Sequence, residues 1–151
     1  MGVGGAFVTG PAWVVDFLVQ RARSFIFSTA PPPAMAAALE AALTVVADEP
    51  ERRAQLLERA ALLRRLLADE GVPVLPGCSQ IIPVMIGDNA RAVTVAETLQ
   101  ADGFDVRAIR PPTVPPGTAR LRVSVNVNVD EATLRRFASA LATSLRSCVP
   151  A

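Results

Sequence analysis

The chain has 151 residues, of which 51% are apolar, and a formal net charge of +1 at pH 7. This length and apolar content suit one domain with a sizeable core, and the near-neutral charge argues against nucleic acid or an anionic membrane as partner. The sequence holds no histidine, which excludes Ser-His-Asp and Cys-His catalysis and every metal site built on imidazole. It also holds no lysine: all 15 basic residues are arginine.

The cysteines and the apolar segments predict a cytosolic protein. Cys78 and Cys148 lack CxxC spacing, which favours reduced thiols over a zinc or redox site, while a disulfide between them stays open. Residues 34–47 form the longest apolar stretch, but Glu40 interrupts it and it is too short to span a bilayer. Residues 1–10 lack the charged start of a signal peptide, so we expect a cytosolic location and no membrane partner.

The first part of the chain predicts a strand, a helix and an apolar segment. Residues 6–10 follow a glycine-rich run and predict a buried strand. A proline suited to a first helical turn opens residues 11–23, whose apolar stripe and closing arginines predict a helix. Residues 25–27 are predicted core, and Ser28 or Thr29 is expected to cap the next helix.

Two helices are predicted next. Residues 34–47 are rich in alanine and predict a buried helix. Asp48 is expected to cap a second helix with Pro50 in its first turn, and Gly71 is expected to end it. The apolar stripe of this second helix consists of Leu56, Ala60, Leu63 and Leu67.

From residue 80 onward the pattern predicts a compact βαββα unit. The expected elements are a strand at 81–87, a helix from Asp88 to Gly103, strands at 105–109 and 120–127, and a helix opened by Asp130. Their core-facing residues are Ala92, Val95, Ala96, Leu99, Leu134, Phe137, Ala138, Leu141 and Leu145. Pro83 argues for an edge or an entry position of the first strand. This order predicts an α/β fold in which a mostly antiparallel sheet is covered by helices on one face.

The strands at 105–109 and 120–127 and the turn between them carry the candidate binding residues. Arg120 and Arg122 share the polar face of the strand at 120–127, next to a proline-rich turn that carries Thr113 and Thr118. Two guanidinium groups in this position would suit a carboxylate or a phosphate. The pattern by itself favours a solvated strand face over such a clamp.

Two segments resemble a known family. The run AIRPPTVPPGTARLRVS at 108–124 is similar to the C-terminal signature of the 8-amino-7-oxononanoate synthases, a branch of the α-oxoamine synthase family. The run FSTAPPP at 27–33 resembles a second segment of that family. The resemblance extends from Gly2 to about Arg146 and implies the C-terminal portion of a pyridoxal phosphate (PLP) enzyme of fold type I.

The resemblance implies a division of the chain and a reaction. Residues 1–33 correspond to the end of the large PLP-binding domain, residues 34–47 to a connecting helix, and residues 48–151 to the small domain. The implied reaction is the PLP-dependent condensation of L-alanine with pimeloyl thioester to 8-amino-7-oxononanoate, a step of biotin biosynthesis. The implied partners are these small molecules and either a second copy of the chain in a homodimer or a complementing N-terminal half.

The resemblance also assigns site residues. Thr29, with Ser28 beside it, matches the residue that contacts the cofactor phosphate bound by the other subunit. Thr113 matches a substrate contact, and Arg122 matches the arginine that holds the carboxylate of the amino acid. No metal site is implied.

The chain departs from the family pattern at two places. The glycine run after Met1 follows the cofactor lysine in the family, so the resemblance places that lysine about two residues before Met1, and we expect no catalytic residue and no activity in this chain alone. Asn126-Val127-Asn128 replaces the usual Ala-Ala-His. Three alternatives therefore stay open: glycine C-acetyltransferase, another α-oxoamine synthase, and a non-catalytic small-domain module.

Overall fold

A computed structural model describes residues 2–148, and the chain divides into two compact units, Met1–Pro50 and Glu51–Ala151. Met1, which the sequence analysis placed inside a longer family pattern, lies outside the described residues. The predicted assignment of residues 1–33, 34–47 and 48–151 to parts of a larger fold stays a prediction.

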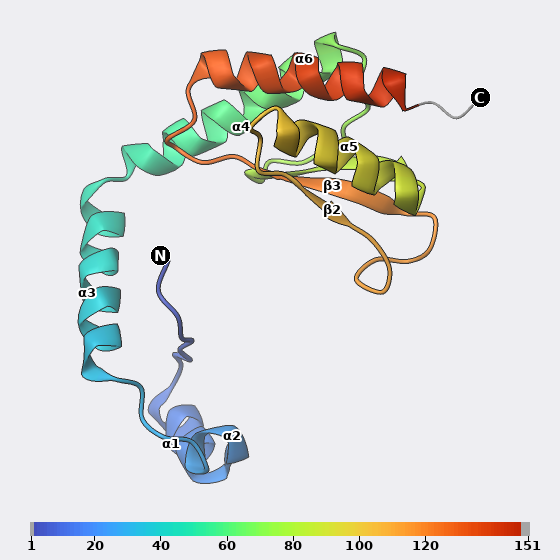
Figure 1. The fold of residues 1–151 in the computed structure, drawn as a ribbon. Helices are drawn as coiled ribbons and strands as arrows, with labels where there is room; N and C mark the ends of the chain where they lie inside the picture. Colours follow the sequence, from blue (N-terminus) through green and yellow to red (C-terminus); the bar gives the residue numbers. More distant parts are fainter. Residues whose placement is uncertain (1, 149–151) are drawn as a thin grey trace. The chain divides into compact units, whose positions relative to one another are not determined.

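The first unit contains three helices, α1 (Ala12–Arg21), α2 (Arg23–Ile26) and α3 (Pro33–Asp48) (Figure 1). Prolines open both longer helices, because the first helical turn has no use for the amide hydrogen that proline lacks. Pro11 is the N-cap of α1, and Pro32 is the N-cap of α3. The helix predicted at 11–23 ends at Arg21, and α2 follows as a separate short helix.

Residues 6–10 are irregular, so the predicted strand is wrong. A strand is stabilised by pairing with a neighbour, and among residues 2–148 every strand belongs to the second unit. The glycine-rich run before it also bends the backbone, since Gly5 has a φ of +123°.

The apolar side chains of the first unit are exposed. None of its described residues is buried, and the side chains of Trp13 and Phe27 are 73% and 78% exposed. The predicted core at 25–27 and the predicted burial of the helix at 34–47 are therefore wrong for this chain, although the helix itself is confirmed. Three helices of this length cannot cover one another on all sides.

Two predicted helix caps are also wrong. Neither Ser28 nor Thr29 caps α3; instead the Ser28 hydroxyl donates a hydrogen bond of 3.1 Å to the carbonyl oxygen of Phe25. Asp48 is the last residue of α3 and does not open α4 (Glu51–Asp69). Across the described part of the chain, no helix has both the length and the apolar content needed to cross a bilayer.

The second unit has the predicted βαββα order after α4, which confirms the fold class. Its elements are β1 (Ile81–Gly87), α5 (Asn89–Ala101), β2 (Arg107–Ile109), β3 (Ala119–Ser124) and α6 (Glu131–Ser147). The sheet has the order β1-β3-β2 with both pairings antiparallel, so β1 lies at an edge, one of the two positions predicted from Pro83. The helices α4, α5 and α6 lie on one side of this sheet (Figure 1).

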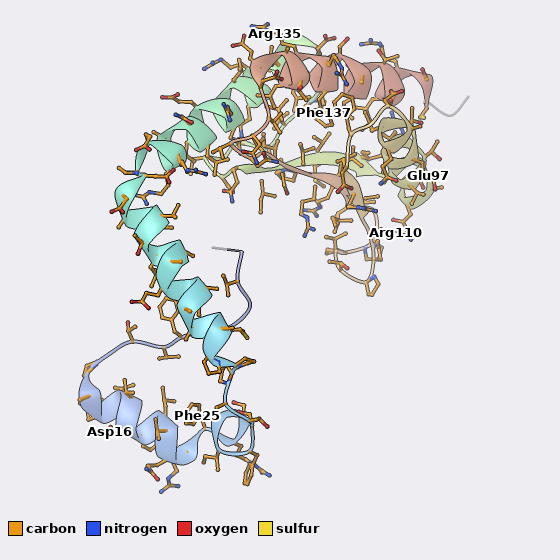
Figure 2. The ribbon with its side chains drawn as sticks, turned by 60° about the vertical axis from the view of Figure 1, so that its left-hand side comes forward. Asp16, Phe25, Glu97, Arg110, Arg135 and Phe137 are labelled. Atoms are coloured by element: carbon orange, nitrogen blue, oxygen red, sulfur yellow. The ribbon has the colours of Figure 1, made fainter. Side chains whose placement is uncertain are left out.

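The predicted stripes form the core between the helices and the sheet. The largest fully buried side chains are those of Leu63, Leu67, Ile82, Leu99, Leu121, Leu141, Val84 and Val95. Full burial of one such side chain stabilises the fold by about 1.5–3 kcal/mol. Figure 2 shows Phe137 on the inner side of α6 and Arg135 on its outer side, in agreement with the burial of Phe137 and the exposure of Arg135.

The helix ends of the second unit agree with the predicted signals. Asp88 accepts a hydrogen bond of 2.8 Å from the amide of Arg91, and Asp130 accepts one of 2.8 Å from the amide of Thr133. Gly71, with a φ of +75°, follows α4 and lets the chain reverse in the left-handed conformation that glycine adopts without strain.

Candidate functional site

The face of the sheet opposite the helices carries three arginines. Arg107 in β2 is paired with Arg122 in β3, and Pro83 in β1 is paired with Arg122 from the other side. In the neighbouring row Arg120 lies between Met85 and Ile109. Residues paired directly across strands point to the same face, and the buried Leu121 and Val123 point to the opposite one.

Arg120 is engaged by the loop that precedes its strand. Its Nε donates a hydrogen bond of 3.0 Å to the carbonyl oxygen of Thr118, and a terminal nitrogen donates one of 3.2 Å to the Thr118 hydroxyl. The same hydroxyl donates a bond of 2.7 Å to the carbonyl oxygen of Pro115. Arg120 therefore holds the proline-rich loop and has fewer donors left for a ligand.

Arg122 is the arginine that is free to bind. It is exposed, and among residues 2–148 no partner hydrogen-bonds or ion-pairs with its guanidinium group. Pro83 beside it contributes no charge. A guanidinium group offers a planar fork of donors that matches a carboxylate, so Arg122 is suited to hold such a group in two hydrogen bonds.

Arg107 and Asp105 were missed by the sequence analysis. They form an ion pair of 2.9 Å with side chains that are 67% and 80% exposed. The sequence showed that Asp105 and Arg107 lie on the same face of the predicted strand. It did not show that Arg107 is paired with Arg122, because this pairing depends on the strand register across the loop at 110–118, and no local sequence pattern determines that register.

Thr113 lies in the loop between β2 and β3, so the structure brings it to the same hairpin as Arg122. Its amide donates a hydrogen bond of 3.1 Å to the carbonyl oxygen of Arg110, whose side chain Figure 2 shows in this loop. Thr113 is exposed, and its hydroxyl has no hydrogen-bond partner among the described residues.

Ser28 and Thr29 lie between α2 and α3 in the first unit, whereas Arg122 belongs to the second unit. The two groups of residues are therefore described separately. The Thr29 hydroxyl is exposed and has no hydrogen-bond partner within residues 2–148, whereas that of Ser28 already donates to Phe25. This donor set fits one edge of a phosphate. It does not fit the whole of a PLP site, because the chain has no lysine to hold the cofactor covalently.

The residues that replace Ala-Ala-His build a turn. The side-chain oxygen of Asn126 accepts a hydrogen bond of 2.9 Å from the amide of Asn128, and Asp130 opens α6 immediately afterwards. An asparagine in this role closes a local turn between strand and helix. Cys78 and Cys148 are both free thiols, so the disulfide left open by the sequence is absent.

Comparison with known proteins gives a consistent match. Residues 1–141 match the model of the family described as aminotransferase class I and II. An 8-amino-7-oxononanoate synthase from Anaeromyxobacter dehalogenans is 50% identical over 151 residues, which are 99% of this chain and 38% of that protein. The chain thus spans less than half the length of this relative.

Solved structures share the fold. A serine palmitoyltransferase solved with PLP aligns with a TM-score of 0.88 and 26% identity, over 97% of this chain and 37% of its own. An 8-amino-7-oxononanoate synthase from Francisella tularensis aligns with a TM-score of 0.78 and 20% identity, over 90% of this chain and 40% of its own.

Proposed function

We propose a function from one premise, that the chain belongs to the aminotransferase class I and II family. The function is that of the C-terminal portion of a PLP-dependent 8-amino-7-oxononanoate synthase, which joins L-alanine to pimeloyl thioester. The 50% identity to the Anaeromyxobacter dehalogenans enzyme supports this assignment. The observation that carries it is the guanidinium of Arg122, which lies unpartnered among the described residues on the open face of the sheet.

Arg122 would hold the carboxylate of the amino acid. Two parallel hydrogen bonds from one guanidinium fix both the position and the orientation of a carboxylate, and β3 holds the base of this side chain between two paired strands. A rigid strand positions a binding group more accurately than a loop does. Arg122 thereby orients the substrate, and it takes no proton at any stage.

Thr113 and Thr29 would supply hydroxyl donors. The Thr113 hydroxyl, at the turn of the hairpin that carries Arg122, would contact the substrate. The Thr29 hydroxyl, with Ser28 beside it, would donate to the phosphate of PLP bound by the other subunit of a homodimer. When bound, PLP supplies the electron sink for the chemical step. The lysine that holds it must come from residues outside these 151, since none of them is a lysine.

We place the complete enzyme in the cytosol, as expected from the cysteines and from the biosynthetic reaction. Its substrates are an amino acid and an acyl thioester. A glycine C-acetyltransferase of the same family is the second candidate, because Asn126-Val127-Asn128 departs from the Ala-Ala-His that relatives commonly carry, and the exact substrate is therefore not assigned by this segment.

A chimeric enzyme tests the proposed function. The portion of the Anaeromyxobacter dehalogenans relative that this chain matches is replaced by this chain, and turnover is measured with two substrate pairs. We expect activity with L-alanine and pimeloyl thioester, and at least about tenfold less with glycine and acetyl thioester. The same chimera with the cofactor lysine of the relative replaced by alanine is the control for background.

Two outcomes would overturn the proposal. Preference for glycine and acetyl thioester would assign the chain to the second candidate. A folded chimera that binds PLP and turns over neither pair would indicate a non-catalytic module.

A further inference from the structure

Two arginines face each other across the open side of the sheet. The antiparallel register pairs Arg107 in β2 directly with Arg122 in β3, and both are exposed. Directly opposed residues on one face of an antiparallel pair have Cβ atoms about 4.5–5.5 Å apart, and like charges in such a pair repel. The repulsion is relieved when an anion lies between the two guanidinium groups.

The surroundings of this pair point to a ligand anion. Pro83, on the other side of Arg122, carries no charge, and the next row places Met85 and Ile109 on either side of Arg120. Arg120 itself is tied to Thr118. Within residues 2–148 the carboxylate of Asp105 forms an ion pair with Arg107 at 2.9 Å, and no carboxylate pairs with Arg122.

We propose that Arg107 and Arg122 bind one substrate carboxylate between them and that Asp105 competes with this carboxylate for Arg107. The inference rests on the proposed function, which assigns the carboxylate of the amino acid to Arg122, and it adds Arg107 and Asp105 as residues that set the affinity. Arg122 would donate to both oxygens of the carboxylate, and Arg107 would donate a further hydrogen bond to one of them. The ion pair between Asp105 and Arg107 is exposed and therefore weak, so a ligand that also contacts Arg122 can replace it.

The signs of two substitutions distinguish this arrangement from a merely structural role. Removal of Arg107 takes away one of two cations and should weaken binding. Removal of the charge of Asp105 takes away a competitor and should strengthen binding. A structural ion pair would behave differently, because loss of either partner would then have the same sign or no effect.

The experiment uses the 151-residue chain itself. The chain is labelled with ¹⁵N, and the Nε–Hε signals of its arginines are followed by NMR while N-acetyl-L-alanine is added at constant ionic strength. This probe carries an amino-acid carboxylate without the ammonium group that arginines would repel. The variants are Arg107→Gln, Arg122→Gln and Asp105→Asn. The control is Arg65→Gln, which also removes one exposed positive charge but lies in α4, on the helix-covered side of the sheet (Figure 1).

We expect Arg107→Gln to raise the apparent Kd by roughly 2- to 5-fold and Asp105→Asn to lower it by roughly 2- to 5-fold, the range of an exposed ion pair. Arg122→Gln should raise the Kd more than Arg107→Gln does, and Arg65→Gln should leave it unchanged. Amide spectra that match the unsubstituted chain confirm that each variant is folded.

Failure of the paired site can be distinguished from failure of the proposed role of Arg122. If Arg122→Gln weakens binding while Arg107→Gln and Asp105→Asn match the control, the paired site is wrong and the role of Arg122 stands. If Arg122→Gln matches Arg65→Gln, the proposed role of Arg122 fails and the paired site fails with it. An unsubstituted chain whose arginine signals do not respond to the probe overturns the paired site as well.

Discussion

The ring of Phe104 meets the ring of Phe137 edge to face, with centroids 5.3 Å apart and planes at 75°. This contact joins the segment after α5 to the inner side of α6, and Phe137 is 6% exposed. Of the six phenylalanines and one tryptophan of the chain, these two lie in the second unit and the others in the first. The aromatic residues therefore report separately on the two units.

Chymotrypsin should cut the first unit before the second. Trp13, Phe17 and Phe25 are at least 60% exposed in a unit without buried residues, whereas Phe104 and Phe137 pack into the core of the other. Cleavage requires local opening, which is easiest where few apolar contacts hold the backbone. A time course with mass spectrometry should show a resistant product that begins near α4. Early cleavage after Phe104 or Phe137 would contradict the fold described above.

Two leucines of α4 should differ strongly in their contribution to stability. Leu63 is 1% exposed, and its replacement by alanine should lower the free energy of unfolding by about 2–5 kcal/mol, because the cavity left in the core is not refilled. Leu57 lies in the same helix at 51% exposure and provides the matched control, with a change of about 0.5 kcal/mol or less. Urea denaturation measures both, and similar losses would show that α4 does not pack on the sheet as described.

Much of the second unit could be predicted from the sequence, since local and long-range signals agree there. Asp88 and Asp130 each open a helix with an apolar stripe, and the alternation at Leu121 and Val123 marks the buried face of β3. The compact unit begins earlier than predicted, at Glu51, because Ala60, Leu63 and Leu67 of α4 join its core.

The errors arise where apolar content was taken as burial. Phe27 and the helix at 34–47 are apolar and yet exposed. An apolar segment is buried only where another part of the protein covers it, and the sequence of the segment alone does not show which part that is. The strand expected at 6–10 fails for the same reason, since a strand needs a partner. Of the candidate site, Arg122 follows from pattern and resemblance, whereas Arg107 becomes visible only when the register of the hairpin is known.

The stability of the chain should depend on Asp130 at acid pH. Hydrogen bonds from the side chain and the amide of Thr133 hold the pKa of Asp130 below its ordinary value of 3.8. The folded state therefore binds the proton less readily than the unfolded state, so this contribution is present above about pH 5 and is lost as the pH falls through the lowered pKa.

The variant Asp130→Asn isolates this effect, because asparagine keeps the capping oxygen and does not titrate in this range. Thermal unfolding of both proteins between about pH 6 and pH 2 should show a larger fall of Tm for the unsubstituted chain at the acid end. Parallel curves for the two proteins would mean that the hydrogen bonds to Thr133 do not stabilise the ionised form.

PLP should form no covalent link to an internal residue of this chain. The sequence holds no lysine, so its one primary amine is the α-amino group of the first residue. Incubation with PLP, reduction with borohydride and peptide mapping by mass spectrometry should find label at the first residue or nowhere. Specific label at any internal residue would refute the expectation that the cofactor lysine lies outside this chain.

We propose that Arg122, and not Arg120, holds the carboxylate of the amino acid. The two arginines lie on the same face of β3, but Arg120 is bound to Thr118 and Arg122 is free among the described residues. A charge-assisted hydrogen bond to a carboxylate contributes about 1.5–3 kcal/mol, which corresponds to a factor of roughly 10 to 150 in affinity.

The most direct measurement is the KM for L-alanine in the chimeric enzyme, with Arg122→Ala and Arg120→Ala compared at matched PLP occupancy. The account predicts that Arg122→Ala raises this KM roughly 10- to 150-fold while PLP binding stays nearly unchanged, and that Arg120→Ala raises it less than about threefold. Equal effects of the two substitutions, or a loss of PLP binding in Arg122→Ala, would contradict the account.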